Sequence, residues 1–257
     1  MAASRSGAVN PVAAIQGKSH KCLVEIAGVV MLEGVIETVL QSGCFDRVFV
    51  SIEDEAVLRS VPQIDEWMNE GKVGFVASEG NLADSVYAAV KNIDDPFPMV
   101  ITTGDNALHT PELLRDYVAD LEKSDGDVCV GFAEKSVIRA EFPDVRIAFY
   151  EFSDGGYSNC NLYGLKSERA LPIIKAFRGG GQFGKKAIRI IKAFGMLNFL
   201  IFRTRRFKFA TIIGRIGRSY GVRVRAIVVP YSFAPIDVDN PEVLVLTDQI
   251  LTERRGL

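Results

Sequence analysis

Short apolar runs alternate with helix-like segments through the first half of the chain, and this alternation constrains the fold more than any other feature. The helix-like segments lie at about 30–42, 83–92 and 110–123, and the strand-like runs around them are 47–51, 73–77, 98–103 and 127–132. Alternation of this kind predicts an α/β fold, a Rossmann-like three-layer arrangement in which helices cover both faces of a mostly parallel sheet. Ligands of such sheets bind at the carboxyl ends of the strands.

After these runs the pattern changes. Two stretches typical of antiparallel strands, 145–152 and 158–164, flank the turn-forming residues 153–156, so we expect a hairpin beside the sheet. Two basic amphipathic helices, at about 184–200 and 207–219, are expected next.

A strand over 222–229 and a closing helix at about 241–254 complete the pattern, and neither a repeat nor a linker interrupts it. A chain of 257 residues with 48% hydrophobic content can bury one sizeable core. We therefore expect a single domain, 1–257, that carries a basic helical insertion at about 169–221.

Several kinds of protein are not expected. No uncharged apolar stretch approaches the roughly 20 residues that cross a bilayer, and the beginning of the sequence lacks the apolar core of a signal peptide. We therefore expect a cytoplasmic protein. The four cysteines are widely spaced and there are only two histidines, so we expect free thiols and no zinc site.

Charge divides sharply along the chain. Residues 1–168 contain 13 Lys and Arg against 27 Asp and Glu, residues 169–236 contain 15 against 0, and residues 237–257 contain 2 against 5. The segment without a carboxylate predicts either an anionic partner or internal pairing with the acidic part, and the sequence favours neither. Because apolar residues interleave with Lys and Arg in this segment, a module that binds an anionic membrane surface peripherally is one alternative to an enzyme. Nucleic acid is the less favoured partner.

The first group of candidate site residues lies near the start of the chain. The small residues of the stretch 2–7 can bring backbone N–H groups against phosphate oxygens, and Arg5 and Lys21 can supply positive charge to a triphosphate. From composition alone, a solvated surface position is the more common role for each of these basic side chains.

Two acidic stretches could hold a hard cation. Asp105 follows a predicted strand directly, where a carboxylate can bind Mg²⁺ against a nucleotide phosphate, although a turn residue is the alternative. Asp237 and Asp239 are two residues apart, so on an extended segment both point to the same side and could complete the Mg²⁺ shell. For this pair the alternative is a pair of acidic residues that stabilises the start of a helix.

A glycine-containing loop, 78–86, joins a predicted strand to a predicted helix. Its Gly80 permits close approach of a nucleotide base, and Asn81 or Ser85 could hydrogen-bond to that base. Residues that start the helix are the alternative. For Asn161, in the expected hairpin, we favour a structural role over contact with an acceptor or nucleotide.

The stretch 2–5, followed by 20–24 and 27–28, resembles the loop and lysine that open the MobA-like NTP-transferases. In that family the loop holds the β- and γ-phosphates, and the lysine contacts the phosphates around the reacting centre. The resemblance assigns phosphate contacts to four residues here: Ala3, Ser4, Arg5 and Lys21.

Two features depart from the family's opening. Ser4 stands where the family has a second glycine, and the spacing from the loop to Lys21 is longer. In addition, the family's first and central strand would precede Ala2, where this sequence has only Met1. We therefore expect an incomplete sheet and impaired activity, or a natural start further upstream.

The acidic stretches resemble the same family. Its Thr-x-x-Asp motif matches the segment from Thr102 to Asp105, and the resemblance implies that Asp105 binds a metal. Of the later pair, it implies a metal ligand at one acid, for which we choose Asp239 over Asp237. The loop around Gly80, Asn81 and Ser85 resembles the base pocket of related cytidylyl- and guanylyltransferases. The resemblance covers roughly 2–168 and 222–254.

The implied function is a Mg²⁺-dependent nucleotidyltransferase. It would transfer a nucleoside monophosphate from an NTP to a phosphorylated small-molecule or lipid-linked acceptor and release pyrophosphate, with Arg5, Lys21 and Asp105 as its catalytic residues. A nucleotide-sugar-dependent glycosyltransferase of related fold, in which an Asp-x-Asp pair holds the metal, is the alternative enzyme. The Arg-and-Lys opening argues against that alternative.

Overall fold

The computed structural model describes residues 10–175 and 204–256, and these form two compact units. The first unit takes its described residues from Met1–Ser78, Thr102–Asp116 and Ile236–Leu257, and the second takes them from Glu79–Ile101 and Tyr117–Pro235. Both units are assembled from stretches that are separate in the sequence. The expected single domain therefore stays a prediction, because the division does not follow chain order.

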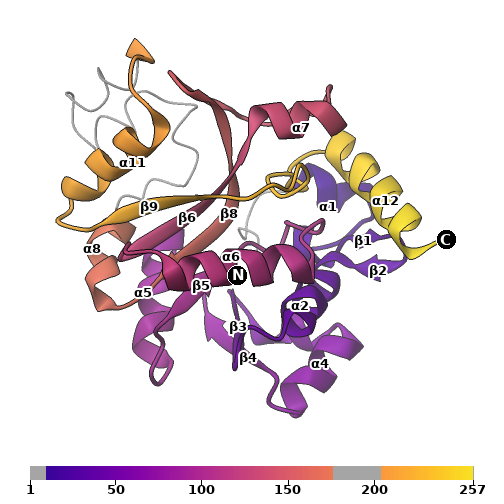
Figure 1. Ribbon diagram of the computed structural model, residues 1–257. Helices are drawn as coiled ribbons and strands as arrows, with labels where there is room; N and C mark the ends of the chain where they lie inside the picture. Colours follow the sequence, from indigo (N-terminus) through magenta and orange to yellow (C-terminus); the bar gives the residue numbers. More distant parts are fainter. Residues whose placement is uncertain (1–9, 176–203, 257) are drawn as a thin grey trace. The chain divides into compact units, whose positions relative to one another are not determined.

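The first unit contains short helices around two pairs of strands (Figure 1). Its elements are α1 (Pro11–Ile15), the 3-10 turn η1 (Lys21–Leu23), β1 (Glu25–Ile26), β2 (Val29–Val30), α2 (Met31–Ser42), β3 (Val48–Ile52), α3 (Glu55–Arg59), α4 (Pro62–Asn69), β4 (Val73–Ala77) and α12 (Pro241–Arg255). Strand β3 runs parallel to β4, and β1 pairs antiparallel with β2. The parallel pairing of β3 and β4 agrees with the predicted parallel sheet, although no helix was predicted between these strands.

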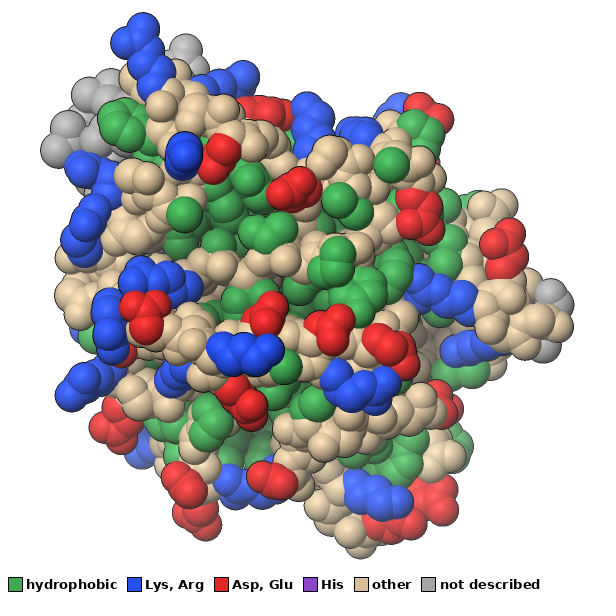
Figure 2. Space-filling model, viewed as in Figure 1, with side chains coloured by type: hydrophobic (Ala, Val, Ile, Leu, Met, Phe, Trp, Pro, Cys, Tyr) green, Lys and Arg blue, Asp and Glu red, His purple; other side chains and the backbone are tan. Residues whose placement is uncertain are grey.

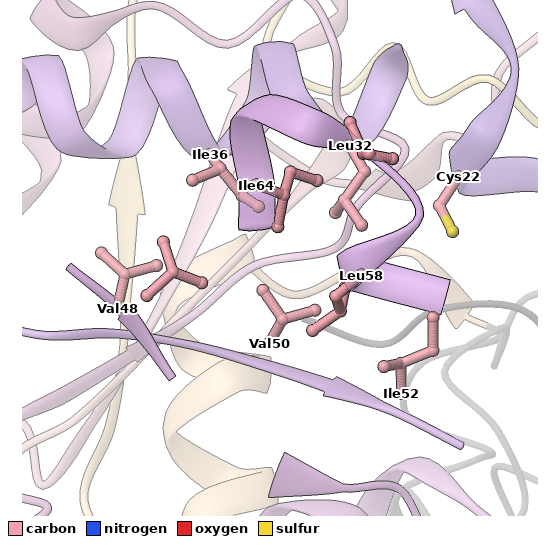
Figure 3. Packing of buried hydrophobic residues seen from close by; sticks show 10 residues of the cluster. Cys22, Leu32, Ile36, Val48, Val50, Ile52, Leu58 and Ile64 are labelled. Atoms are coloured by element: carbon pink, nitrogen blue, oxygen red, sulfur yellow. The ribbon is translucent and has the colours of Figure 1, made fainter. Parts of the chain in front are cut away.

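One core of the first unit lies against a single face of β3. Val48, Val50 and Ile52 alternate with more exposed residues, as the two-residue period of a strand requires, and are buried. They pack against apolar side chains from η1, α2, α3 and the start of α4 (Figure 3): Cys22, Leu32, Ile36, Leu58, Val61 and Ile64. This core fixes η1 against the β3 strand.

A second core of the first unit joins chain segments that are distant in sequence. Val24 and Ile26, around β1, pack with Met31 at the start of α2 and with Val238 and Leu244 from the other end of the chain. Val24 and Val238 are completely buried. The segment that precedes α12 is therefore held against the β1 and β2 hairpin by apolar contact.

The second unit is built on a mixed five-stranded sheet. Its elements are α5 (Leu82–Asn92), β5 (Met99–Ile101), β6 (Val128–Glu134), α7 (Lys135–Glu141), β7 (Tyr150–Phe152), β8 (Gly155–Leu165), η2 (Glu168–Ala170), α8 (Leu171–Ile174), α11 (Phe209–Arg218) and β9 (Val224–Val228). The strand order is β5-β8-β6-β9, with β7 paired to β8. Helix α6 (Pro111–Lys123) begins in the first unit and ends in the second.

Strand β8 lies inside this sheet, antiparallel to both β5 and β6. The predicted hairpin is present as β7 and β8, but β7 begins only at Tyr150 and the predicted place beside the sheet is wrong. Alternation of side chains identifies a strand but not its neighbours in the sheet, which explains the difference. Cys160 and Leu162 of β8 are completely buried. A Cβ atom on Gly164 would lie 2.6 Å from Leu121 Cδ1, so a glycine is needed where α6 packs on the strand. Asn161 has a φ of 54° at the bulge opposite β6, in keeping with the structural role favoured above.

The other predicted elements within the described residues are present with small shifts at their ends. The parallel pairing of β6 with β9 agrees with the predicted sheet. Five short helices of the described residues, α1, α3, α4, α7 and α8, were not predicted, because each is too short to show a clear helical period. The helix expected at about 184–200 lies outside the described residues.

The basic helix expected at about 207–219 is present as α11, and its apolar face is used within the second unit. Phe209 stacks on Tyr157 with ring centroids 4.1 Å apart and meets Phe132 edge-on at 4.7 Å. Ile212 is buried as well. The apolar side of this helix is therefore packed against protein, which removes one of the two helices on which the membrane alternative rested.

Part of the basic segment pairs internally. Arg223 contacts Asp127, and Arg225 makes two hydrogen bonds of 2.8 Å to Asp125. Figure 2 shows Lys and Arg side chains together with Asp and Glu over the face on which α11 and β9 lie. At these positions internal pairing, one of the two interpretations of the charge division, accounts for the basic side chains. In the described part of the chain, no helix combines the length and the apolar character needed to cross a membrane.

The core around β3 can be tested by truncating Ile36. This side chain is completely buried, so Ile36→Ala is expected to lower the free energy of unfolding by about 2–5 kcal/mol, measured by denaturant titration. Ile15 is 55% exposed, and Ile15→Ala is expected to change it by less than about 0.5 kcal/mol. Equal losses in the two variants would contradict the packing described here.

Candidate active site

Lys21 lies at the start of η1 and is followed by two buried residues, Cys22 and Val24. Cys22 is part of the core around β3, and Val24 is part of the core that contains Val238. With both anchors fixed, the Lys21 side chain reaches two carboxylates of the first unit. Its Nζ donates to Asp105 Oδ2 at 2.5 Å and to Asp239 Oδ1 at 2.9 Å.

Asp105 lies in a loop that is held by its own hydrogen bonds. Thr103 Oγ1 lies 2.5 Å from Asn106 Oδ1, and the His109 N–H donates to the Asn106 carbonyl. Asn106 and Leu108 are buried, so the loop is anchored on the side away from solvent. The Asp105 side chain is only 17% exposed.

The segment before α12 presents two acids to the same side. Ile236 and Val238 are completely buried, and in an extended segment this alternation directs Asp237 and Asp239 away from the core. The Val238 N–H donates to the Asp105 carbonyl at 3.0 Å, which joins this segment to the Asp105 loop. The predicted convergence of Asp105, Asp237 and Asp239 is therefore present in the structure.

These three acids are able to hold a metal ion. Each offers a carboxylate oxygen, and the three oxygens lie within 4.8 Å of one another. The second oxygen of Asp105, Oδ1, is buried and has no hydrogen-bond partner. A set of oxygen donors alone is what hard cations such as Mg²⁺ prefer, and a buried carboxylate oxygen is costly to leave without a partner. The donor set therefore fits a divalent cation.

The charges of the site act on Lys21. Burial lowers the pKa of this ammonium, but the negative charges of Asp105 and Asp239 raise it by more, so its pKa lies above the usual range for lysine. Lys21 is therefore a fixed positive charge. Burial raises the pKa of the neighbouring Cys22 thiol to about 12, so this cysteine serves the core as a neutral group.

A second polar pair lies next to Lys21 and was missed by the sequence analysis. His20 Nε2 lies 2.8 Å from Glu53 Oε1, and Ser19 Oγ lies 2.9 Å from His20 Nδ1. Glu53 directly follows β3. Its position at the carboxyl end of a predicted strand was the signal that could have found it.

Helix α12 holds the turn between β1 and β2 and the loop that follows Asp105. Asp248 accepts from the Ala27 N–H at 2.7 Å, and Arg255 donates to the Ala27 carbonyl at 2.7 Å. Arg254 donates to the Leu108 carbonyl at 2.9 Å. Ala27 has a φ of 48°, a conformation that residues with a side chain rarely adopt, and these contacts from α12 stabilise it.

The remaining predicted site residues have other positions. Ala3, Ser4 and Arg5 lie outside the described residues, and their phosphate contacts stay predictions. Gly80, Asn81 and Ser85 belong to the second unit, where Gly80 precedes α5, Asn81 is its N-cap and Ser85 lies in its first turn.

The side chains at the start of α5 have local partners. Asn81 accepts from the Asp84 N–H at 3.0 Å as the helix cap, and Ser85 Oγ accepts from the Glu79 N–H at 2.9 Å. The structural alternative given for these two side chains is therefore present, while contact with a base stays a prediction. A Cβ on Gly80 would meet no atom within 4 Å, so the backbone there is open to a ligand.

The cap of α12 gives a test of how the acidic segment is held. Asn240 accepts from the Val243 N–H at 3.0 Å, directly after Asp239. Asn240→Ala is expected to lower the free energy of unfolding by about 1 kcal/mol, because an N–H at the helix start loses its acceptor. Asn240→Ser keeps an acceptor oxygen and is expected to lose less. Equal unfolding midpoints for wild type and Asn240→Ala would contradict this role.

Sequence comparison identifies relatives of the chain. Residues 10–193 match the family described as the MobA-like NTP transferase domain. The 2-C-methyl-D-erythritol 4-phosphate cytidylyltransferase of Rhodococcus jostii is 31% identical over 101 residues, which are 39% of this chain and 42% of that protein. The match thus spans less than half the length of this curated relative.

Solved structures share the fold. A structure described as a hypothetical transferase from Thermus thermophilus has a TM-score of 0.73 at 22% identity, with 91% of this chain and 94% of that chain covered. The 4-diphosphocytidyl-2C-methyl-D-erythritol synthase of Anaerococcus prevotii has a TM-score of 0.55 at 12% identity over 90% and 93%. A CMP:2-keto-3-deoxy-manno-octonic acid synthetase complexed with CTP has a TM-score of 0.58 at 13% identity over 91% and 92%. These similarities confirm the predicted α/β fold class.

Proposed function

Because the chain belongs to the MobA-like NTP transferase domain family, we propose that it transfers a nucleoside monophosphate from an NTP to a phosphorylated acceptor and releases pyrophosphate. One observation carries the proposal. The site brings together Lys21 and three acids from distant parts of the sequence. The Lys21 ammonium lies within hydrogen-bond distance of Asp105 and Asp239, and the carboxylates of Asp105, Asp237 and Asp239 offer oxygens within 4.8 Å of one another. Phosphoryl and nucleotidyl transfer needs this combination of a cation site and a fixed positive charge.

The proposed reaction is an in-line displacement at the α-phosphorus. An oxygen of the acceptor phosphate forms the new P–O bond as the bond to the β-phosphate oxygen breaks, and pyrophosphate leaves with the bonding electrons. The acceptor oxygen is already nucleophilic, so no strong general base is required. What the protein must supply is orientation and neutralisation of charge.

Each site residue has a role in this proposal. Asp105 and Asp239 would hold the cation, and Asp237 would provide a further carboxylate ligand. When bound, Mg²⁺ supplies neutralisation of phosphate charge and orients the phosphate oxygens. Lys21, with Arg5 from the opening loop, would donate hydrogen bonds to the phosphates and stabilise charge on the leaving group.

The rest of the nucleotide would be bound by two backbone segments. Ala3 and Ser4 would donate N–H groups to the β- and γ-phosphates, as the family resemblance implies. Gly80 would lie beside the base, which is supported by the open space around its Cα. Asn81 and Ser85 would orient that backbone through their own hydrogen bonds.

We propose a phosphorylated small molecule or a lipid-linked phosphate as acceptor, one domain over 1–257, and action in the cytoplasm. Binding of an anionic membrane surface, expected of residues 169–236, would depend mainly on the helix expected at about 184–200. That helix lies outside the described residues. The names of the relatives support CTP as the first nucleotide to test.

A glycosyltransferase is the second candidate enzyme, because Asp237 and Asp239 form an Asp-x-Asp pair within the acidic cluster. Such an enzyme would use a nucleotide sugar as donor. The contact of Lys21 with the same cluster favours the nucleotidyltransferase, since a fixed cation beside the metal site suits a polyphosphate leaving group.

A substrate panel tests the proposed function. The protein is incubated with each NTP and Mg²⁺ against sugar phosphates, alcohol phosphates and pterin phosphates, and pyrophosphate is measured. Release is expected with at least one pair and is expected to stop when EDTA removes the metal. Nucleotide sugars are included as donors in a parallel panel. Transfer from a nucleotide sugar without pyrophosphate release from any NTP would favour the glycosyltransferase.

Substitution of Asp105 tests the metal site itself. Asp105→Asn removes the charge of the central acid, and kcat is expected to fall by at least about 100-fold while the far-UV circular dichroism spectrum is unchanged. Asp120→Asn is the matched control, because Asp120 is an exposed acid on α6 outside the cluster. Full turnover by Asp105→Asn would remove Asp105 from the mechanism.

A further inference from the structure

The Lys21 ammonium lies where the metal site would have its cation. Its Nζ is 2.5 Å from an oxygen of Asp105 and 2.9 Å from an oxygen of Asp239, and both acids belong to the set that can hold a metal. The Lys21 side chain is only 14% exposed. The protein alone therefore already fills part of its acidic cluster with a positive charge of its own.

The position of the ammonium, rather than the net charge of the cluster, opposes a metal ion here. The three carboxylates and the ammonium together have a formal charge of −2, which still attracts a divalent cation. However, Mg²⁺ needs its oxygen ligands at about 2.0–2.1 Å in a near-octahedral arrangement. An ion bound to both Asp105 and Asp239 would lie within a few ångströms of the ammonium and would be repelled by it.

Lys21 must therefore move before both acids can bind the ion, and that movement needs a new partner. The ammonium is largely buried and accepts no hydrogen bonds, so loss of both carboxylates leaves its N–H groups without acceptors. A free cation provides no acceptor for the N–H groups of Lys21. A polyphosphate provides acceptors, because its oxygens can bind the ammonium and the cation at once.

We propose that the acidic cluster takes its divalent cation as a chelate with a polyphosphate, and not as the free ion. Lys21 is the residue that couples the two ligands, since it leaves the carboxylates only when phosphate oxygens receive it. This inference rests on the proposed function, for which the cluster is the metal site. The inference adds to the proposed function that the protein binds free divalent cations weakly when no nucleotide is present.

Binding of Mn²⁺ to the full chain tests the inference without turnover. Water proton relaxation reports Mn²⁺ held by the protein, first with Mn²⁺ alone and then with Mn²⁺ and inorganic tripolyphosphate, each corrected by a titration without protein. Wild type is expected to bind Mn²⁺ alone weakly and to gain at least about tenfold in affinity with tripolyphosphate. Lys21→Met is expected to bind Mn²⁺ alone at least about tenfold more tightly than wild type and to show little further gain.

Two other lysine variants separate this role from damage to the fold. Lys18, which pairs with Glu25, lies outside the cluster, so Lys18→Met is expected to bind Mn²⁺ as wild type does. Lys21→Arg keeps a cation against the acids and is expected to keep binding of Mn²⁺ alone weak. Circular dichroism checks that each variant is folded.

The outcomes also separate this inference from the proposed function. Equal affinity of wild type and Lys21→Met for Mn²⁺ alone, or no gain in wild type from tripolyphosphate, would overturn the coupling and leave the nucleotidyltransferase intact. If Asp105→Asn does not weaken Mn²⁺ binding under any condition, the metal site fails and the inference fails with it. Coupled binding without pyrophosphate release from any NTP would refute the transfer reaction alone.

Discussion

The candidate site depends on one ion-pair arrangement. The ammonium of Lys21 lies between carboxylates that are 84 and 218 residues away in the sequence. At a protein surface such pairs contribute little to stability. Here the ammonium is largely buried, and the hydrogen bond from Val238 to the Asp105 carbonyl joins the same two chain segments. Without the ammonium, like charges would face each other where these segments meet, so a cation is required to hold the site together.

Apolar packing sets the positions of the charged groups. Cys22 follows Lys21, Leu108 follows the Asp105 turn, and Val238 separates the two later acids, and all three are buried. Packed interiors yield little to small forces, so these anchors limit how far the polar atoms can move. A reaction that relies on orientation and charge rather than on a strong base needs this kind of support.

The sequence predicted the parts of the site that obey local rules. Asp105 follows a strand, Asp237 and Asp239 alternate with buried residues, and the resemblance to a family pointed to Lys21. The contacts from Glu53 and from α12 were missed, because they depend on which side chains the folded chain brings together. Pairing explains the other miss, since alternation marks β8 as a strand but does not specify its neighbours in the sheet. The opening loop and the base contacts stay predictions.

The interleaving of the two units has a consequence for biosynthesis. The first unit takes its last stretch from Ile236 onward, so the ribosome delivers every residue of the second unit before that stretch. While the second unit is being completed, the nascent chain contains Lys21 and Asp105 but not Asp239, the partner of Lys21. It also lacks α12, which donates a hydrogen bond to the Leu108 carbonyl in the loop after Asp105. The second unit can fold during this time, whereas the acidic cluster assembles only after the segment with Asp237 and Asp239 has been synthesised. A chain released before Ile236 lacks two of the three acids and cannot form the cluster, whatever its degree of folding.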